Sequence, residues 1–143
     1  MKYDLDLDLV DLVSFLPQVD EDDFSSYLET SIFKSKDKKN LDKPDFRGWY
    51  PLHYLACDNI DKANAIAEML IKAGSNINVK DDDGDTPLHY TIFNNNLTVL
   101  KILLNEGADV TIKNKRGQTP AGFALKFGGR QKIYHLLKGN LKY

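Results

Sequence analysis

A short string of residues occurs three times along this chain, and the repetition limits the folds open to it. The clearest copy is 81–89, which reads Asp-Asp-Asp-Gly-Asp-Thr-Pro-Leu-His. With the glycines aligned, a related string at 45–53 lies 36 residues earlier and another at 114–120 lies 33 residues later. Fixed periods of this size are typical of solenoids and repeat arrays, in which each unit packs on its neighbours. The chain is therefore predicted to be a stacked scaffold.

Each copy contains the signals of two short helices joined by a polar loop. In the middle copy Thr86 is a good N-cap and Pro87 suits the first helical position, so a helix to about Asn94 is predicted. A second helix over 97–106 has a wide apolar face, and Gly107 supplies its C-terminal left-handed turn. The residues that follow, 109–112, are predicted to be extended.

The outer copies repeat this pattern with small departures. The first copy predicts helices over 50–58 and 61–73, a terminating Gly74 and an extended exit at 76–79. The third keeps Thr119 and Pro120, has a loop at 128–129 and predicts a last helix over 130–138. It is shorter and more polar, as expected of a terminal repeat with one face lacking a neighbour.

The pattern resembles the ankyrin repeat over roughly residues 45–139. The resemblance rests on the 33-residue step and on the strings Thr86-Pro87-Leu88-His89 and Leu103-Leu104-x-x-Gly107-Ala108-Asp109-Val110. It implies an all-α solenoid of helix pairs with projecting β-hairpin loops and a concave face that binds other proteins. It also implies that His53 and His89 are structural hydrogen-bonding residues that connect neighbouring units.

One continuous repeat domain is expected over 45–143, divided into 45–80, 81–113 and 114–143. Residues 1–44 lack the repeat pattern but have helical apolar spacing, with Pro17 closing a first helix. We interpret this segment as an N-terminal helical cap, and the alternative is an arm that binds the partner directly. Charge is polarised, because residues 1–29 carry nine acids and one base whereas 113–143 carry eight bases and no acid.

Several kinds of chemistry are disfavoured by the sequence. The single Cys57 cannot form an internal disulfide, the acidic N-terminus lacks a secretory pattern, and no apolar stretch has the length of a membrane span, so a cytoplasmic protein is expected. Cys57 has no base at recognisable spacing, and the acidic run 81–85 lacks the twelve-residue calcium loop. We therefore expect no enzymatic activity, no cofactor and no metal. Net negative charge makes nucleic acid an unlikely partner.

The predicted contact surface follows from the resemblance, in which the hairpin tips and the end of each first helix vary. Four large aromatic residues at such positions are not needed by the scaffold, and exposed aromatic and Arg side chains are common binding hot spots. The alternative is that some of them pack locally. The predicted contacts are Phe46, Arg47, Trp49, Cys57 and Asp58 in the first copy, Asp82, Asp83, Asp85, Phe93 and Asn94 in the second, and Lys115, Arg116, Gln118, Lys126 and Phe127 in the third.

Protein binding without catalysis is the function that these observations favour. A short chain that is nearly all scaffold acts mainly by occupying a surface, so we expect an intracellular inhibitor of a toxin or enzyme, similar to an immunity protein. The alternative is a bacterial or viral effector or adaptor that binds a host protein. We expect the free protein to be monomeric.

Overall fold

The computed structural model describes residues 42–57, 61–127 and 130–139, with the side chains of 61–63 excepted. The predicted N-terminal helices and the predicted contact residue Asp58 lie outside the described residues. The division of the chain at residue 44 therefore stays a prediction. Within the described part, all three repeats are present as consecutive helix pairs.

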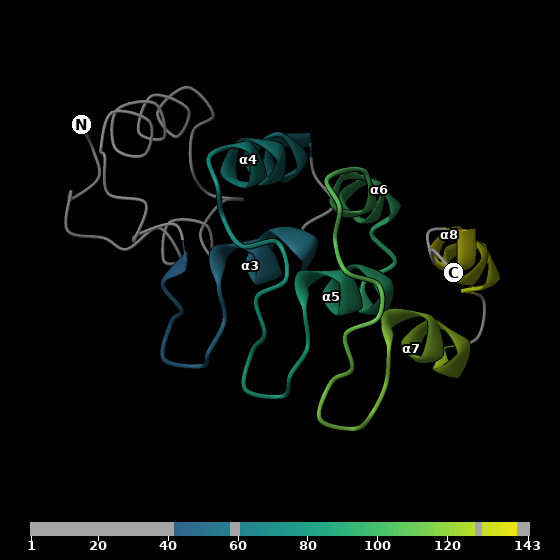
Figure 1. Ribbon diagram of the computed structural model, residues 1–143. Coiled ribbons are helices and arrows are strands. Elements are labelled where there is room, and N and C mark those ends of the chain that lie inside the picture. The colour runs from purple at the N-terminus through teal and green to yellow at the C-terminus, as the bar shows by residue number, and fades with distance from the viewer. Residues whose placement is uncertain (1–41, 58–60, 128–129, 140–143) are drawn as a thin grey trace, which may run out of the picture.

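The helices form two parallel rows (Figure 1). One row contains the first helix of each repeat: α3 (Pro51–Cys57), α5 (Pro87–Phe93) and α7 (Pro120–Lys126). The other contains the second helices: α4 (Asp61–Lys72), α6 (Leu97–Asn105) and α8 (Gln131–Gly139). Helix α5 packs between α3 and α7, and α4 packs on α6. This arrangement confirms the predicted all-α repeat solenoid.

Short helices with sharp starts follow from local capping. Thr86 and Thr119 precede α5 and α7 in extended conformation, and a proline occupies the first helical position after each. Thr119 Oγ1 accepts the backbone N–H of Gly122 at 3.1 Å. Asn96 is the N-cap of helix α6, and its side-chain oxygen accepts the N–H of Val99. Each cap satisfies a backbone donor that the helix itself leaves unpaired.

Three helices end in the same left-handed turn. Gly74 and Gly107 have φ of 104° and 88°, and Asn95 takes this role after α5 with φ of 54°. The next N–H in each case bonds back to a carbonyl five residues earlier, as Ser75 does to Leu70 at 3.0 Å. Asparagine tolerates positive φ better than most residues, so the polar stretch after α5 ends the helix as a glycine would.

The loops after the second helices differ from the sequence-based prediction. Residues 76–79 and 109–112 were expected to be extended, but each contains a tight turn, at 77–78 and at 110–111. The side-chain oxygen of Asn76 accepts the N–H of Asn78 at 2.9 Å, and Asp109 accepts that of Thr111 at 2.8 Å. Asn and Asp side chains commonly form such turns by bonding the backbone two residues on.

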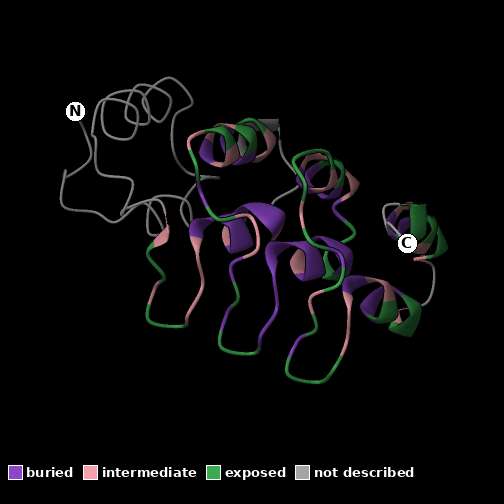
Figure 2. Cartoon of the chain, in the orientation of Figure 1, coloured by how far each residue is buried: buried purple, intermediate pink, exposed green. Residues whose placement is uncertain are grey.

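The projecting loops are hairpins held by very few backbone bonds. In each, two backbone bonds close the loop, as in the second, where Asp81 N–H donates to the Asp85 carbonyl and Gly84 N–H donates to the Asp81 carbonyl, both at 3.0 Å. No residue in 42–57, 61–127 or 130–139 is in a β-strand. Figure 2 shows that buried residues are concentrated in α3 and α5, with further buried residues on α4, α6, α7 and α8. No helix among the described residues has both the length and the apolar character needed to cross a membrane.

The loop glycines allow a test of backbone fit within one chain. Gly84 and Gly117 both have positive φ, at 76° and 74°. A Cβ at Gly84 would lie 3.0 Å from the backbone nitrogen of Lys115 in the next loop, whereas one at Gly117 would meet nothing within 4 Å. Gly117→Ala is expected to lower the free energy of unfolding by about 1 kcal/mol through its φ, and Gly84→Ala by more.

Urea unfolding of the two variants measures this difference. Gly117→Ala serves as the control, because it has the same backbone conformation without the close neighbour. Equal losses of stability would show that the spacing between the second and third loops does not contribute.

Candidate functional site

Each projecting loop begins with a residue whose side-chain oxygen accepts two backbone hydrogen bonds. Asp45, Asp81 and Asn114 occupy equivalent positions in the three loops. Each accepts, through Oδ1, the backbone N–H groups two and four residues later at 2.9 to 3.0 Å. These bonds fix the loop conformation and so the direction of the side chains at its tip. One oxygen suffices for this, which explains why Asp and Asn are interchangeable here.

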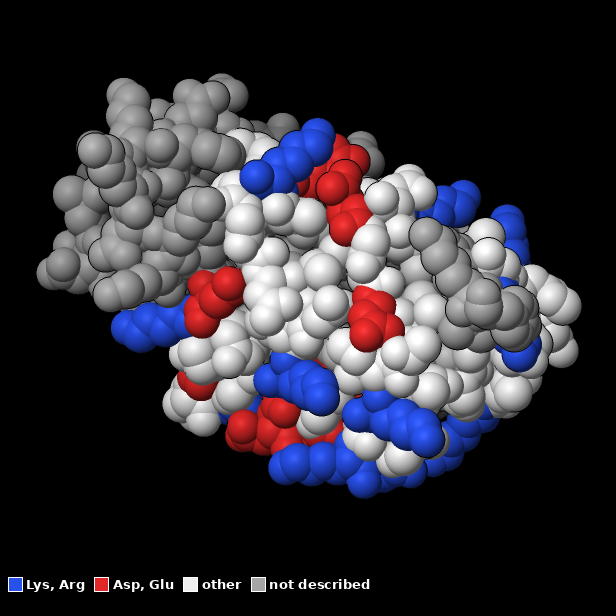
Figure 3. Space-filling view, viewed as in Figure 1, with Lys and Arg blue, Asp and Glu red and all other residues white. Residues whose placement is uncertain are grey.

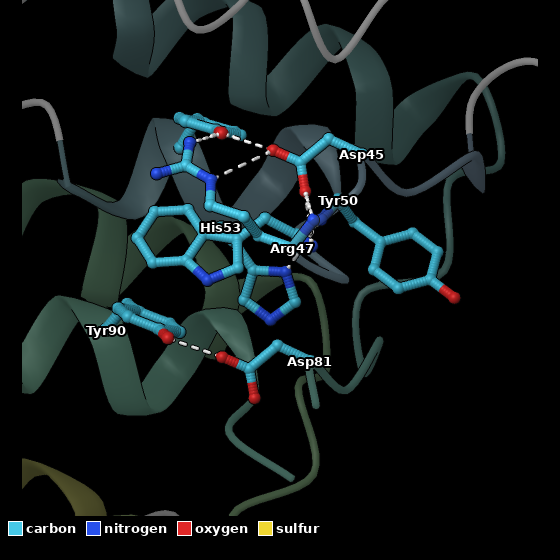
Figure 4. A network of polar contacts seen from close by, with 8 residues as sticks. Asp45, Arg47, Tyr50, His53, Asp81 and Tyr90 are labelled. Atoms are coloured by element: carbon cyan, nitrogen blue, oxygen red, sulfur yellow. Dashed lines mark hydrogen bonds and ion pairs between the residues drawn. The ribbon is translucent and has the colours of Figure 1, made fainter. Parts of the chain in front are cut away.

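The other polar atom of that side chain, Oδ2 in Asp or Nδ2 in Asn, correlates with the residue nine positions later in the following helix. Tyr54 donates its hydroxyl to Asp45 Oδ2, and Tyr90 donates to Asp81 Oδ2, the latter contact drawn in Figure 4. In the third repeat the corresponding residue, nine positions on, is Phe123. Asn114 carries an amide there in place of a carboxylate oxygen, so the hydroxyl and the carboxylate are lost together. Aligning the copies would have revealed this pairing.

His53 and His89 connect each repeat to the next. His53 Nδ1 accepts the N–H of Tyr50 at 3.0 Å, so its proton resides on Nε2, which donates to the carbonyl of Asp85 at 2.9 Å. His89 likewise accepts from the N–H of Thr86 and donates through Nε2 to the carbonyl of Gln118 at 3.0 Å. Both imidazoles are buried. The structural role predicted for these histidines is confirmed.

Burial perturbs the ionisation of these groups. It lowers the pKa of both His53 and His89, although their hydrogen bonds to carbonyls act in the opposite direction. Burial also raises the pKa of Tyr90, and the bond to Asp81 adds to that shift. Burial alone would raise the pKa of Asp45, but the Tyr54 hydroxyl and two backbone N–H groups hold it below its ordinary value.

Trp49 packs at the junction between the first two repeats. Its ring centroid lies 4.9 Å from that of Tyr54 and 4.7 Å from that of Tyr90, and the guanidinium of Arg47 lies 5.3 Å from it. The side chain is only partly exposed. The sequence predicts that the scaffold does not need Trp49, and this is wrong, because the indole packs on rings of two successive repeats. Its contact with a partner stays a prediction.

The remaining predicted contacts divide by exposure. Phe46 is 94% exposed and Phe93 is 56% exposed, so both aromatic side chains are accessible to a partner. Phe127 is partly exposed and packs edge-on against Phe93 at 5.6 Å. The exposed polar members are Arg47, Asp82, Asp83, Asn94, Lys115, Arg116 and Lys126, whereas Cys57 and Gln118 are partly exposed and Asp85 is buried.

A pocket of about 220 Å³ lies between the second and third repeats. Six predicted contact residues line it, and they come from two loops and from the C-terminal ends of α5 and α7. Sequence reasoning did not single out the other three as contacts. The lining residues are Asp83, Asp85, His89, Tyr90, Phe93, Arg116, Phe123, Lys126 and Phe127.

Charges of both signs surround the hairpin side of the molecule. Figure 3 shows acidic and basic groups side by side along the edge where the loops project. Arg116 and Lys126 are exposed, and neither forms an ion pair with another described residue. Exposed charges of this kind favour oppositely charged groups on a partner and raise the rate of association.

Three acidic side chains converge in the second loop. One oxygen from each of Asp81, Asp83 and Asp85 lies within 4.8 Å of the others. The Asp81 carboxylate is already occupied by two backbone N–H groups and by the Tyr90 hydroxyl. The cluster is therefore explained by loop closure, and the expectation of no metal and no cofactor stays a prediction.

Comparisons with known proteins agree with this geometry. A family model for ankyrin repeats matches residues 22–114 and 52–142. A 52-residue segment is 38% identical to an ankyrin repeat and LEM domain-containing protein 1 homolog of Caenorhabditis elegans, covering 36% of this chain and 7% of that protein. A 63-residue segment is 33% identical to an ankyrin repeat protein of monkeypox virus, covering 44% and 10%. The matches thus span about a tenth of these relatives.

The pairing of Asp81 with Tyr90 predicts a coupling between two substitutions. Tyr90→Phe removes the donor from a buried carboxylate, so a loss of about 1–3 kcal/mol in the free energy of unfolding is expected. Adding Asp81→Asn is expected to recover part of that loss. The new amide replaces the unpaired oxygen and lies close to Asp85, much as Asn114 donates to Gln118 Oε1 at 3.1 Å.

A double-mutant cycle by urea unfolding gives the coupling directly. The single variants Tyr90→Phe and Asp81→Asn are its controls, and residues in contact typically couple by about 0.5–3 kcal/mol. Strict additivity of the two single effects would contradict the pairing.

The lowered pKa of His53 and His89 predicts the sign of the pH dependence of stability. Below about pH 6.5 the unfolded chain binds protons on these residues and the folded chain resists doing so. Stability is therefore complete above that pH and falls as the pH decreases toward the folded pKa. Each histidine contributes at most about 1.4 kcal/mol per pH unit.

Urea unfolding of the wild type and of His89→Gln at about pH 7.5 and 5.5 measures this contribution. The variant is expected to lose less stability than the wild type between these two conditions, whatever its stability at the higher pH. An unchanged dependence would mean that His89 is not the titrating group. The lowered pKa of Asp45 acts separately, below about pH 4.

Proposed function

The chain belongs to the ankyrin-repeat family, a non-catalytic interaction fold, and from this premise we propose that its protein partner binds across the hairpin tips and first helices, over the pocket between the second and third repeats. The observation that carries this proposal is the convergence of six predicted contact residues on that one pocket. Ankyrin repeats form a protein–protein interaction module, so the question is which part of the surface binds.

Two features of the pocket support it as the centre of the interface. Its rim contains exposed Phe93 and Arg116, and aromatic residues and Arg are enriched at protein interfaces. Exposed Lys126 adds a second positive charge there. Its walls are continuous with the exposed loop tips, so a partner seated over the pocket also meets the charged residues there. An interface of this kind has an apolar centre and a polar rim.

We further propose that binding inhibits the partner, which is a cytoplasmic toxin or enzyme. A rigid surface that buries a partner's side chain blocks whatever that side chain and its neighbours do. The single Cys57 is in keeping with a reducing compartment, where disulfides are rare. In this mode of action the repeats act by occupying a surface.

Binding of a host protein by a viral or bacterial effector is the second candidate. The similarity to an ankyrin repeat protein of monkeypox virus favours it. In that mode the same face recruits a protein and leaves its activity intact. The two candidates share the interface and differ in what happens to the partner.

The test is affinity capture from a lysate of the source organism, with mass spectrometry of the eluate, using the wild type and Phe93→Ala/Arg116→Ala. The matched control is Leu125→Ala/Lys101→Ala, which also removes one exposed apolar and one basic side chain but lies outside the pocket. We expect one stoichiometric partner whose affinity falls about tenfold or more in the first variant alone.

Two outcomes decide the details. Equal capture by all three proteins would place the interface elsewhere and overturn the proposed site. The purified partner is then assayed with increasing amounts of this protein, and loss of its activity at one equivalent supports inhibition. Full activity in the saturated complex would favour the effector or adaptor.

A further inference from the structure

The pocket exists because the second repeat has a short side chain where the first has a large one. In the register of the repeats, Trp49 corresponds to Asp85, 36 residues later. The indole of Trp49 packs between Tyr54 of its own repeat and Tyr90 of the next, with centroid distances of 4.9 and 4.7 Å. The first junction is thereby filled by the chain itself.

The second junction has the same aromatic walls without the aromatic between them. The residues that correspond to Tyr54 and Tyr90 are Tyr90 and Phe123, and both line the pocket. Asp85 is too short to fill the space, and its Oδ1 accepts the side-chain amide of Asn114 at 3.0 Å. The pocket is thus a place for an aromatic ring that the chain does not supply.

The size of the pocket suits one side chain. Its volume of about 220 Å³ is below the range of about 300–1,000 Å³ usual for small-molecule sites. Phe93 and Phe127 extend the aromatic wall on the α5 and α7 side, where their rings meet edge-on at 5.6 Å. Edge-to-face contacts of this kind favour an aromatic guest over an aliphatic one.

The walls of the pocket are held in place before any partner arrives. Three hydrogen bonds connect the second repeat to the third loop: Lys115 N–H to the Asp83 carbonyl at 3.0 Å, Asn114 to Asp85, and His89 Nε2–H to the Gln118 carbonyl at 3.0 Å. A preformed cavity saves the partner the entropy of ordering these groups, which strengthens binding.

The exposed charged residues at the pocket rim determine which partner residues are favoured next to the bound aromatic side chain. The charged residues that line the pocket are Asp83, Asp85, Arg116 and Lys126, and their formal charges sum to zero. The Asp85 carboxylate already accepts the Asn114 amide, whereas Arg116 and Lys126 are exposed and without ion pairs among the described residues. Asp85 is only 7% exposed. Residues 113–143, which include Arg116 and Lys126, contain eight bases and no acid. Carboxylates on the partner are therefore favoured.

We propose that this pocket receives one aromatic side chain from an acidic segment of the partner protein, in the position that Trp49 occupies one repeat earlier, while adjacent partner carboxylates contact Arg116 and Lys126. This inference rests on the proposed function and adds to it the chemistry of the recognised segment. The first junction is its template, because there the Trp49 ring packs between Tyr54 and Tyr90, the residues equivalent to Tyr90 and Phe123 at the pocket.

A random heptapeptide library displayed on phage, selected on the immobilised full-length chain, tests the proposal. We expect enrichment of peptides with Trp, Phe or Tyr next to Asp or Glu. Asp85→Trp places an indole in the pocket and is expected to weaken the selected peptide about tenfold or more. Asp85→Asn is its control, since it keeps the oxygen that Asn114 contacts and leaves the pocket open.

A second pair of variants tests the charge independently and covers the case in which Asp85→Trp fails to fold. Arg116→Glu/Lys126→Glu is expected to change the selected peptides from acidic to basic. Lys72→Glu/Lys101→Glu makes the same change in net charge at exposed positions of α4 and α6, and this variant is expected to keep the preference for acidic peptides. Circular dichroism of each variant establishes that it is folded.

Three results would overturn the inference: selection without aromatic enrichment, wild-type affinity in folded Asp85→Trp, or acidic peptides selected by the charge-reversed variant. Self-association that Arg116→Glu/Lys126→Glu abolishes would also overturn it, by assigning the pocket to a second copy of this chain. If such a result accompanies successful partner capture that depends on Phe93 and Arg116, the proposed function stands and only the pocket chemistry fails.

Discussion

The imidazole-to-carbonyl bond between successive repeats is the contact on which the rest of this structure depends. His53 and His89 each use one nitrogen to start their own helix and the other to hold the loop of the next repeat. One side chain therefore sets both the local conformation and the spacing of the stack. Because a helix pair of this size cannot bury its apolar face alone, that spacing is what closes the core.

The architecture was predictable because its signals are local. Thr-Pro at the helix starts and glycine at the ends act over a few residues, and the 33-residue period shows that these local signals recur. The structure has helices where they predict them. The turns at 77–78 and 110–111 had equally local signals, in Asn76 and Asp109, but polar and apolar residues alternate there, a pattern that also occurs in extended chain. Side-chain bonding to the backbone outweighed that pattern.

The site was less predictable because it depends on contacts between repeats. Trp49 packs on Tyr90, 41 positions away, and this contact forms only when the repeats are stacked in register. The pocket depends on a small residue, Asp85, at a position where a large one would close it. A list of exposed aromatic residues cannot reveal such a space, although aligning Trp49 with Asp85 and Tyr54 with Tyr90 would have pointed to it.

Gly122 stands where His53 and His89 stand in the earlier repeats. The hydrogen bond from an imidazole Nε2–H to the loop carbonyl of the next repeat is therefore made by the first two repeats, and the third repeat has no donor for it. Each junction is directional, with a donor on one side and a carbonyl on the other, so a duplicated second repeat inserted before the third would match both of its neighbours. One placed after the third would find no imidazole to receive it. Because of this one glycine, the array accepts an additional repeat between its existing repeats and not after the third.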